Sequence, residues 1–156
     1  MRRYAAQTTV PIERSRGEIE RTLSRYGADS FAYAANKRRA MLTFKAHGRV
    51  IRFVLELPEF ECFRATPRGR RRRSDEDAYR HWEQACRQSW RALALVIKAK
   101  LEAVESGIAV FETEFLPYTV LPNGKTVGDW ALPQVARAYE TGKMPALLPA
   151  YLEGTE

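Results

Sequence analysis

The chain has 156 residues, of which 45% are hydrophobic, so it can bury one sizeable core but not a second. It has 26 basic and 19 acidic residues, a net charge of +7, and only two cysteines, which excludes a disulfide framework and favours a reducing compartment. No apolar run has the length of a signal peptide or a membrane span. We therefore expect a single cytoplasmic domain, 1–156, that has no contact with a membrane.

The first predicted element is a short helix. The Ser15–Glu18 segment has the spacing of a capping box, and apolar residues follow at helical spacing as far as Gly27, which supplies a stop. We expect the helix to begin at Ser15.

Three runs of alternating apolar residues follow from Ser30 onward. Their apolar positions are Phe31 and Tyr33, then Leu42, Phe44 and Ala46, then Ile51, Phe53, Leu55 and Leu57. Residues 36–39 separate the first two runs, and His47-Gly48 forms a tight turn between the second and third. The pattern predicts a three-stranded antiparallel meander that ends at Pro58. Its opposite face is expected to be partly solvated, with Thr43, Lys45, Arg52 and Glu56.

An arginine-dense segment, 64–73, follows the meander. It contains one proline, one glycine and no periodic apolar residue, and its like charges repel one another. We expect a mobile loop over residues 64–74.

The second predicted helix is long. The Ser74–Asp77 segment is a capping signature with acids in the first turn, where they meet the helix dipole favourably. Apolar residues then recur at steps of three and four until Gly107: Tyr79, Trp82, Cys86, Trp90, Leu93, Ile97, Leu101 and Val104. This stripe is expected to pack on the sheet.

The last third of the chain is less clearly patterned. Residues 108–121 favour neither helix nor strand, whereas Asn123-Gly124 is a strong turn signal. A short helix is expected from Asp129 to Thr141, with Gly142 as its stop and an irregular tail from residue 143. The expected fold class is α+β: a short helix, a three-stranded antiparallel meander, a long helix packed on the sheet and a short C-terminal helix.

The basic residues are concentrated in the first half of the chain. Up to Arg73 there are 18 basic and 7 acidic residues, whereas the remainder has 8 and 12. Four cations of the long helix lie within a narrow arc, a basic ridge, although a solvated helix face is the plainer interpretation. The candidate nucleic-acid-binding residues are Lys37, Arg38, Arg39, Lys45, Arg52, Arg68, Arg70, Arg71, Arg72, Arg73 and the ridge Arg80, Arg87, Arg91 and Lys98.

Arginine outnumbers lysine 20 to 6. Guanidinium groups pair bidentately with phosphate and stack on bases, so this bias favours phosphate or base contact. We expect nucleic acid as the partner, DNA more than RNA, bound largely independently of sequence, although the arginine loop itself does not distinguish the two. A single strand would also use aromatic stacking platforms, and the candidates are Tyr4, Phe31, Tyr33 and Tyr79, each of which could instead be a core residue. The arginine run alone could also be a localisation signal or a linker.

Catalytic patterns are weak. His47 and His81 have no neighbour at a metal-ligand spacing, and Gly124-Lys-Thr126 lacks the first glycine of a phosphate-binding loop. Glu112 and Glu114 could lie on one side of a strand, as in a metal-dependent nuclease, but no third ligand follows. We expect a protein that is not an enzyme and has no metal or cofactor, with the nuclease kept as an alternative.

Another alternative is a protein-interaction module that docks on an acidic host protein through the basic half. The C-terminal third supplies apolar residues that could face a partner or a second copy: Leu116, Tyr118, Trp130, Leu147, Leu148 and Tyr151.

Three segments resemble small proteins of unknown function encoded by bacteriophages and prophages. They are Trp90-Arg-Ala-Leu-Ala-Leu-Val-Ile-Lys-Ala-Lys-Leu-Glu-Ala-Val-Glu-Ser-Gly107, followed by Phe115-Leu-Pro, and Leu121-Pro-Asn-Gly-Lys-Thr-Val-Gly-Asp-Trp130, and the resemblance extends over most of 8–149. It implies a phage setting in a bacterial cell. The order of meander and long helix is also similar in topology to Rad52-type single-strand annealing proteins, which would imply single-stranded DNA binding in recombination.

Overall fold

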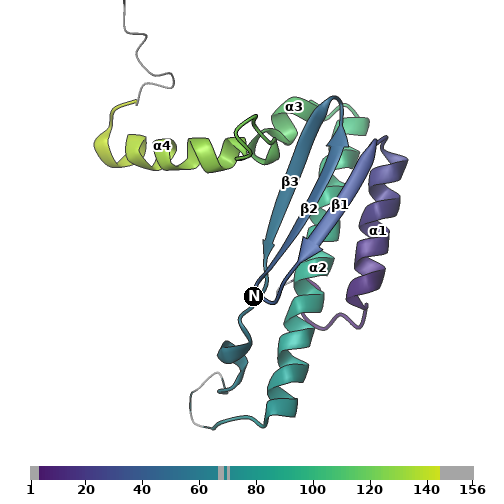
Figure 1. Cartoon of the computed structure of the whole chain (residues 1–156), viewed down its shortest axis with the longest axis vertical. Coiled ribbons are helices and arrows are strands. Elements are labelled where there is room, and N and C mark those ends of the chain that lie inside the picture. Colours follow the sequence, from purple (N-terminus) through teal and green to yellow (C-terminus); the bar gives the residue numbers. More distant parts are fainter. Residues whose placement is uncertain (1–3, 67–68, 70, 145–156) are drawn as a thin grey trace, which may run out of the picture.

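Two helices cover one face of a three-stranded sheet, and a third long element projects from its end (Figure 1). The computed structural model describes residues 4–66, 69 and 71–144. The elements are α1 (Ile12–Arg25), β1 (Ser30–Ala35), β2 (Arg39–Ala46), β3 (Arg49–Glu56), the 3-10 helix η1 (Phe60–Phe63), α2 (Asp75–Glu105), α3 (Phe111–Glu114), the 3-10 helix η2 (Leu116–Tyr118) and α4 (Val127–Thr141). This order confirms the predicted α+β arrangement.

The sheet has the order β1-β2-β3 and is antiparallel throughout. Its tightest connection is the predicted His47-Gly48 turn, where φ is +50° at His47 and +69° at Gly48, as a two-residue hairpin turn requires. Phe44 pairs with Phe31 and Ile51 across the strands, so these three side chains share the covered face. The opposite face carries no helix in Figure 1 and is the partly solvated face that the alternation predicts.

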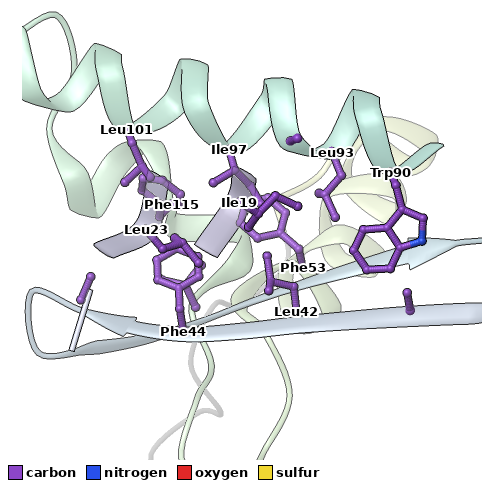
Figure 2. Close-up of a cluster of buried hydrophobic side chains, with 14 of the residues drawn as sticks. Ile19, Leu23, Leu42, Phe44, Phe53, Trp90, Leu93, Ile97, Leu101 and Phe115 are labelled. Atoms are coloured by element: carbon purple, nitrogen blue, oxygen red, sulfur yellow. The ribbon is translucent and has the colours of Figure 1, made fainter. Parts of the chain in front are cut away.

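The core lies between the sheet, α1 and α2 (Figure 2). From α2 it receives Trp90, Leu93, Ala94, Ile97 and Leu101, from α1 Ile19 and Leu23, and from the sheet Ala40, Leu42, Phe44, Ala46, Ile51 and Phe53. Phe115, which follows α3, closes one end: its ring meets those of Phe44 and Phe53 edge-on at 6.0 and 6.3 Å.

The predicted start of α1 is wrong by one turn. The helix begins at Ile12 with Pro11 as its N-cap, and Ser15 lies inside it, fully buried. Proline fixes φ near the helical value and lacks the N–H that a first turn leaves unpaired, so it can open a helix without a side-chain cap. The capping-box spacing at Ser15 is therefore coincidental.

Helix α2 begins and ends as predicted, but its stripe packs differently. The Ser74 hydroxyl accepts a hydrogen bond from the Asp77 N–H at 3.2 Å, and Gly107 has φ +73° just past the end of the helix. The first turns of α2 extend beyond the sheet and lie beside η1 (Figure 1). Consequently Tyr79 is 53% exposed and Trp82 is only partly buried, whereas the stripe is buried from Cys86 to Leu101.

The undecided segment 108–121 contains the short helices α3 and η2, and α4 starts directly against it. Gly128 is buried there, and a Cβ at this position would lie 2.8 Å from the Pro117 carbonyl oxygen, so only glycine allows the approach. Thr126 and Asp129 form a reciprocal capping box, and the hydrogen bond from the Thr126 backbone lowers the pKa of Asp129. The helix ends at Gly142, as predicted, with φ +65°.

None of the helices in the described part of the chain is both long and apolar enough to cross a membrane. The predicted irregular tail lies largely outside the described residues, which end at Met144.

Candidate nucleic-acid interface

The described residues of the arginine-dense segment form a short hairpin. Thr66 donates its N–H to the Arg71 carbonyl at 3.0 Å, and the Arg73 N–H bonds the Arg64 carbonyl at 2.8 Å. Ala65 and Arg72 are bridged in antiparallel fashion between these bonds. The predicted mobility of the loop stays a prediction, and two of its candidate residues, Arg68 and Arg70, lie outside the described residues.

The three described arginines at the end of this segment differ in role. Arg71 and Arg72 are exposed. The Arg73 guanidinium donates to the carbonyls of Phe63 at 3.0 Å and Ala65 at 2.7 Å, and its side chain is only 14% exposed. Arg73 therefore holds the hairpin closed. Its role as a binding residue stays a prediction, with one nitrogen of its guanidinium already bonded to the neighbouring carbonyls.

The basic ridge predicted along α2 is interrupted. Arg91 pairs with Glu18 of α1, and this hydrogen bond raises the pKa of Arg91. Arg87 pairs with Glu83 at 3.3 Å and donates to Gln84. Helix α1 packs alongside this part of α2, and Arg91 joins the two helices, whereas Arg87 is paired within α2.

The two ends of the ridge remain accessible. Arg80 is exposed and only weakly paired, 3.4 Å from Asp77, and Lys98 is exposed near the other end of α2. Arg80 and Lys98 are 18 positions apart on one helix, which is about 27 Å at 1.5 Å per residue. They do not belong to one compact site.

Two candidate cations of the sheet, Lys45 and Arg52, have different surroundings. Lys45 is exposed on the open face, whereas Arg52 is half-buried and donates to the Gly124 carbonyl at 2.8 Å. Arg52 thereby ties β3 to the Asn123-Gly124 turn. Its role as a binding residue stays a prediction, with one nitrogen of its guanidinium bonded to a backbone carbonyl 72 residues away.

The β1–β2 turn presents three adjacent cations. Arg39 pairs with Glu56 at 2.8 Å, and Arg38 lies 3.9 Å from Glu59, too far for a strong ion pair. Lys37 is exposed. The Arg39–Glu56 and Arg38–Glu59 pairs are both largely solvent-exposed, so they constrain the side chains weakly.

Five exposed candidate cations lie at the end of the molecule where α2 begins. We call this set the basic end: Lys37, Arg38, Arg71, Arg72 and Arg80. Lys37 and Arg38 line the same groove as Tyr79, which directly precedes Arg80 in α2. The hairpin that carries Arg71 and Arg72 leads into the same helix end.

A groove of about 400 Å³ runs between the β1–β2 turn, η1 and the first turns of α2. We call it the aromatic groove, and its lining residues are Lys37, Arg38, Glu59, Phe60, Glu61, Tyr79 and Trp82. Sequence reasoning did not identify Phe60 or Trp82 as site residues. The available signal was that Trp82 continues the stripe of α2 past the end of the predicted sheet.

Of the other predicted stacking platforms, Tyr33 and Phe31 pack against side chains of the protein itself. The ring of Tyr33 meets Trp90 edge-on at 6.3 Å and lies under the Arg16 guanidinium at 4.3 Å. Phe31 is half-buried against the core. Tyr4 is 53% exposed, but only Tyr79 combines exposure with a place in the groove.

Among the side chains that could take part in catalysis, His47, Cys86 and Glu114 are respectively stacked, buried and paired within the protein. His47 stacks on Phe111 at 4.3 Å, and burial raises the pKa of the Cys86 thiol to about 11, which leaves little thiolate at neutral pH. Glu112 and Glu114 lie on a helix instead of the expected strand, and Glu114 pairs with Lys100 at 2.7 Å. Within the described residues, no group of three His, Cys, Asp or Glu side chains could hold a metal ion.

No family model, curated protein or solved structure matches the chain. The resemblance to phage-encoded proteins and to annealing proteins stays a prediction. Function is therefore inferred from the chemistry of the basic end and the aromatic groove.

Proposed function

We propose that the protein binds nucleic acid through the basic end, largely independently of sequence. The observation that carries the proposal is a group of exposed cations gathered at one end of the protein. Among the other candidate cations, Arg52, Arg73, Arg87 and Arg91 have hydrogen-bond or ion-pair partners within the protein. Lys37, Arg71 and Arg72 are exposed at one end, and no carboxylate of the described residues pairs with them.

The chemistry of these free cations fits a phosphate backbone. Exposed guanidinium groups form short charge-assisted hydrogen bonds with phosphate, and phosphate contacts carry no sequence information. A compact cluster also steers a polyanion to one end of the molecule. With the resemblance to phage proteins, the proposal extends to single-stranded DNA binding or annealing in phage DNA metabolism, in the cytoplasm of a bacterial host.

Replacing Arg71 and Arg72 together with glutamine tests this assignment. Two phosphate contacts are lost, so the affinity for DNA and RNA of any sequence should fall by about tenfold. The matched control is R21Q/R25Q, which removes the same charge from two exposed arginines of α1. Fluorescence anisotropy with labelled 20-mers measures both variants.

The control separates local contact from net charge. If R71Q/R72Q and R21Q/R25Q weaken binding equally, only overall charge matters and the basic end is not the site. An unchanged affinity in R71Q/R72Q would reduce the arginine hairpin to a linker.

A second candidate function is protein interaction, and the surface of α4 favours it. Leu132, Val135 and Tyr139 are 66, 48 and 89% exposed on this projecting helix. The open face of the sheet offers Met41 and Val54, 38 and 48% exposed, as an apolar surface for a helix. We propose a second copy of the chain as the occupant, with α4 of one copy on the open sheet of the other, because a helix on a sheet already covers the opposite face of this fold.

Sedimentation equilibrium tests the self-association. The unmodified chain should be dimeric at about 100 µM, and L132E/Y139E should be monomeric because a buried unpaired carboxylate opposes association. The control L95E alters an exposed leucine of α2 and should leave the dimer intact. A monomeric unmodified chain at this concentration rules the arrangement out.

A further inference from the structure

We infer that the aromatic groove is a binding site for one unpaired nucleobase of a single strand, whose neighbouring phosphate is held by Lys37. The inference rests on the proposed function and adds a selectivity that phosphate contacts alone cannot give. It assigns a ligand-binding role to Phe60, Tyr79 and Trp82, none of which belongs to the buried core.

The aromatic walls of the groove are held in fixed positions. The Trp82 indole N–H donates to the Pro58 carbonyl at 2.7 Å, which orients the ring. Its centroid lies 6.1 Å from that of Phe60, edge-on at 84°, and 5.6 Å from that of Tyr79 at 46°. Because these rings are already ordered, a ligand that stacks on them causes little loss of side-chain conformational entropy.

The Tyr79 ring is more exposed than its place in the apolar stripe of α2 predicts. Its side chain is 53% exposed although it continues the apolar stripe of α2, because the sheet ends before this turn of the helix. An exposed aromatic ring beside a fixed indole is a typical platform for base stacking, since every base has a π-face. The volume of about 400 Å³ lies within the range of small-molecule sites.

The charges at the rim orient the ligand. Lys37 and Arg38 lie on the side of the β1–β2 turn, whereas Glu59 and Glu61 lie on the side of η1. The carboxylates repel a phosphate, so the phosphate belongs beside Lys37, and the base, which is neutral, stacks on the exposed face of Tyr79. An adjoining hollow of about 770 Å³ follows the same turn past Arg39 and gives the strand a path out of the groove.

This geometry discriminates against a duplex. The faces of paired bases are covered by their neighbours in the stack, and a base must be unstacked before a side chain can lie against it. A duplex therefore reaches only the cations of the basic end, whereas a single strand reaches both the cations and the groove.

The test compares Tyr79→Leu with the control Leu95→Ala, which alters a comparably exposed side chain further along α2. Leucine at position 79 keeps the helix propensity and the apolar contact with Trp82 but removes the π-face. Affinities are measured by anisotropy for a labelled single-stranded DNA 20-mer, the RNA of the same sequence and the DNA duplex. Y79L should weaken binding of the single strands by about tenfold and of the duplex by less than about twofold, whereas L95A should change none of them.

Two further measurements make the outcome decisive. Y79F keeps the ring and should bind as the unmodified chain does, and thermal unfolding should show that Y79L is folded. Unchanged single-strand binding in Y79L, or an equal loss for single strand and duplex, overturns this inference while the proposed function stands. An unmodified chain that binds none of the three nucleic acids overturns both. If the affinities for the single-stranded DNA and the single-stranded RNA differ, the comparison identifies which of the two the groove prefers.

Discussion

Replacing Trp90 with alanine should lower the free energy of unfolding by about 3–5 kcal/mol. Trp90 is 1% exposed and is the point where α2 meets the sheet, with Tyr33 against its edge and the Arg16 guanidinium 4.6 Å above its ring. Removing the indole leaves a large cavity that the sheet and two helices cannot close together. Urea unfolding followed by circular dichroism measures the change.

The matched control is Leu95→Ala on the same helix. Leu95 is 44% exposed, so its removal creates no cavity and should cost about 0.5–1 kcal/mol or less. If W90A and L95A destabilise the chain equally, α2 is not seated on the sheet through Trp90, and the described core is incorrect.

The parts of the fold that were predicted correctly depend on local signals. The Ser74 cap of α2 involves an N–H three residues away, and the His47-Gly48 turn needs only the positive φ of two adjacent residues. Alternation along the strands likewise reports which side chains face the core without reference to distant residues. These features lie in short windows of sequence, so sequence reasoning can find them.

The features that were missed depend on where elements end relative to one another. Tyr79 and Trp82 fit the stripe of α2 as well as Trp90 does, but the helix is longer than the strands that cover it. Periodicity shows which face of a helix is apolar and not how far its partner extends. The aromatic groove arises from this mismatch, so its position could not be read from α2 alone.

The candidate site was only partly predicted for the same reason. The guanidinium groups of Arg91 and Arg52 donate to Glu18 and to the Gly124 carbonyl, partners that are 73 and 72 residues away in sequence. A count of arginines cannot separate those that hold the fold together from those that are free to bind. Arg71, Arg72 and Lys37 remain candidates because the structure leaves them exposed.

Raising the salt concentration from about 50 to about 200 mM should weaken the binding of a single strand by roughly 50-fold. The reason is counterion release: each neutralised phosphate contributes about −0.7 to the slope of log K against log salt. If four of the five cations of the basic end, including Arg71 and Arg72, each neutralise one phosphate, the slope is about −2.8. Anisotropy titrations at four salt concentrations measure it.

The R71Q/R72Q variant sharpens this prediction because it removes two of the four contacts. Its slope should be about −1.4, whereas R21Q/R25Q should keep the slope of the unmodified chain. A steeper slope of about −4.2 in the unmodified chain would correspond to two more contacts, as Arg68 and Arg70 could supply. A slope near zero would contradict phosphate binding altogether, because no cluster of free guanidinium groups can neutralise a nucleic-acid backbone without releasing its counterions.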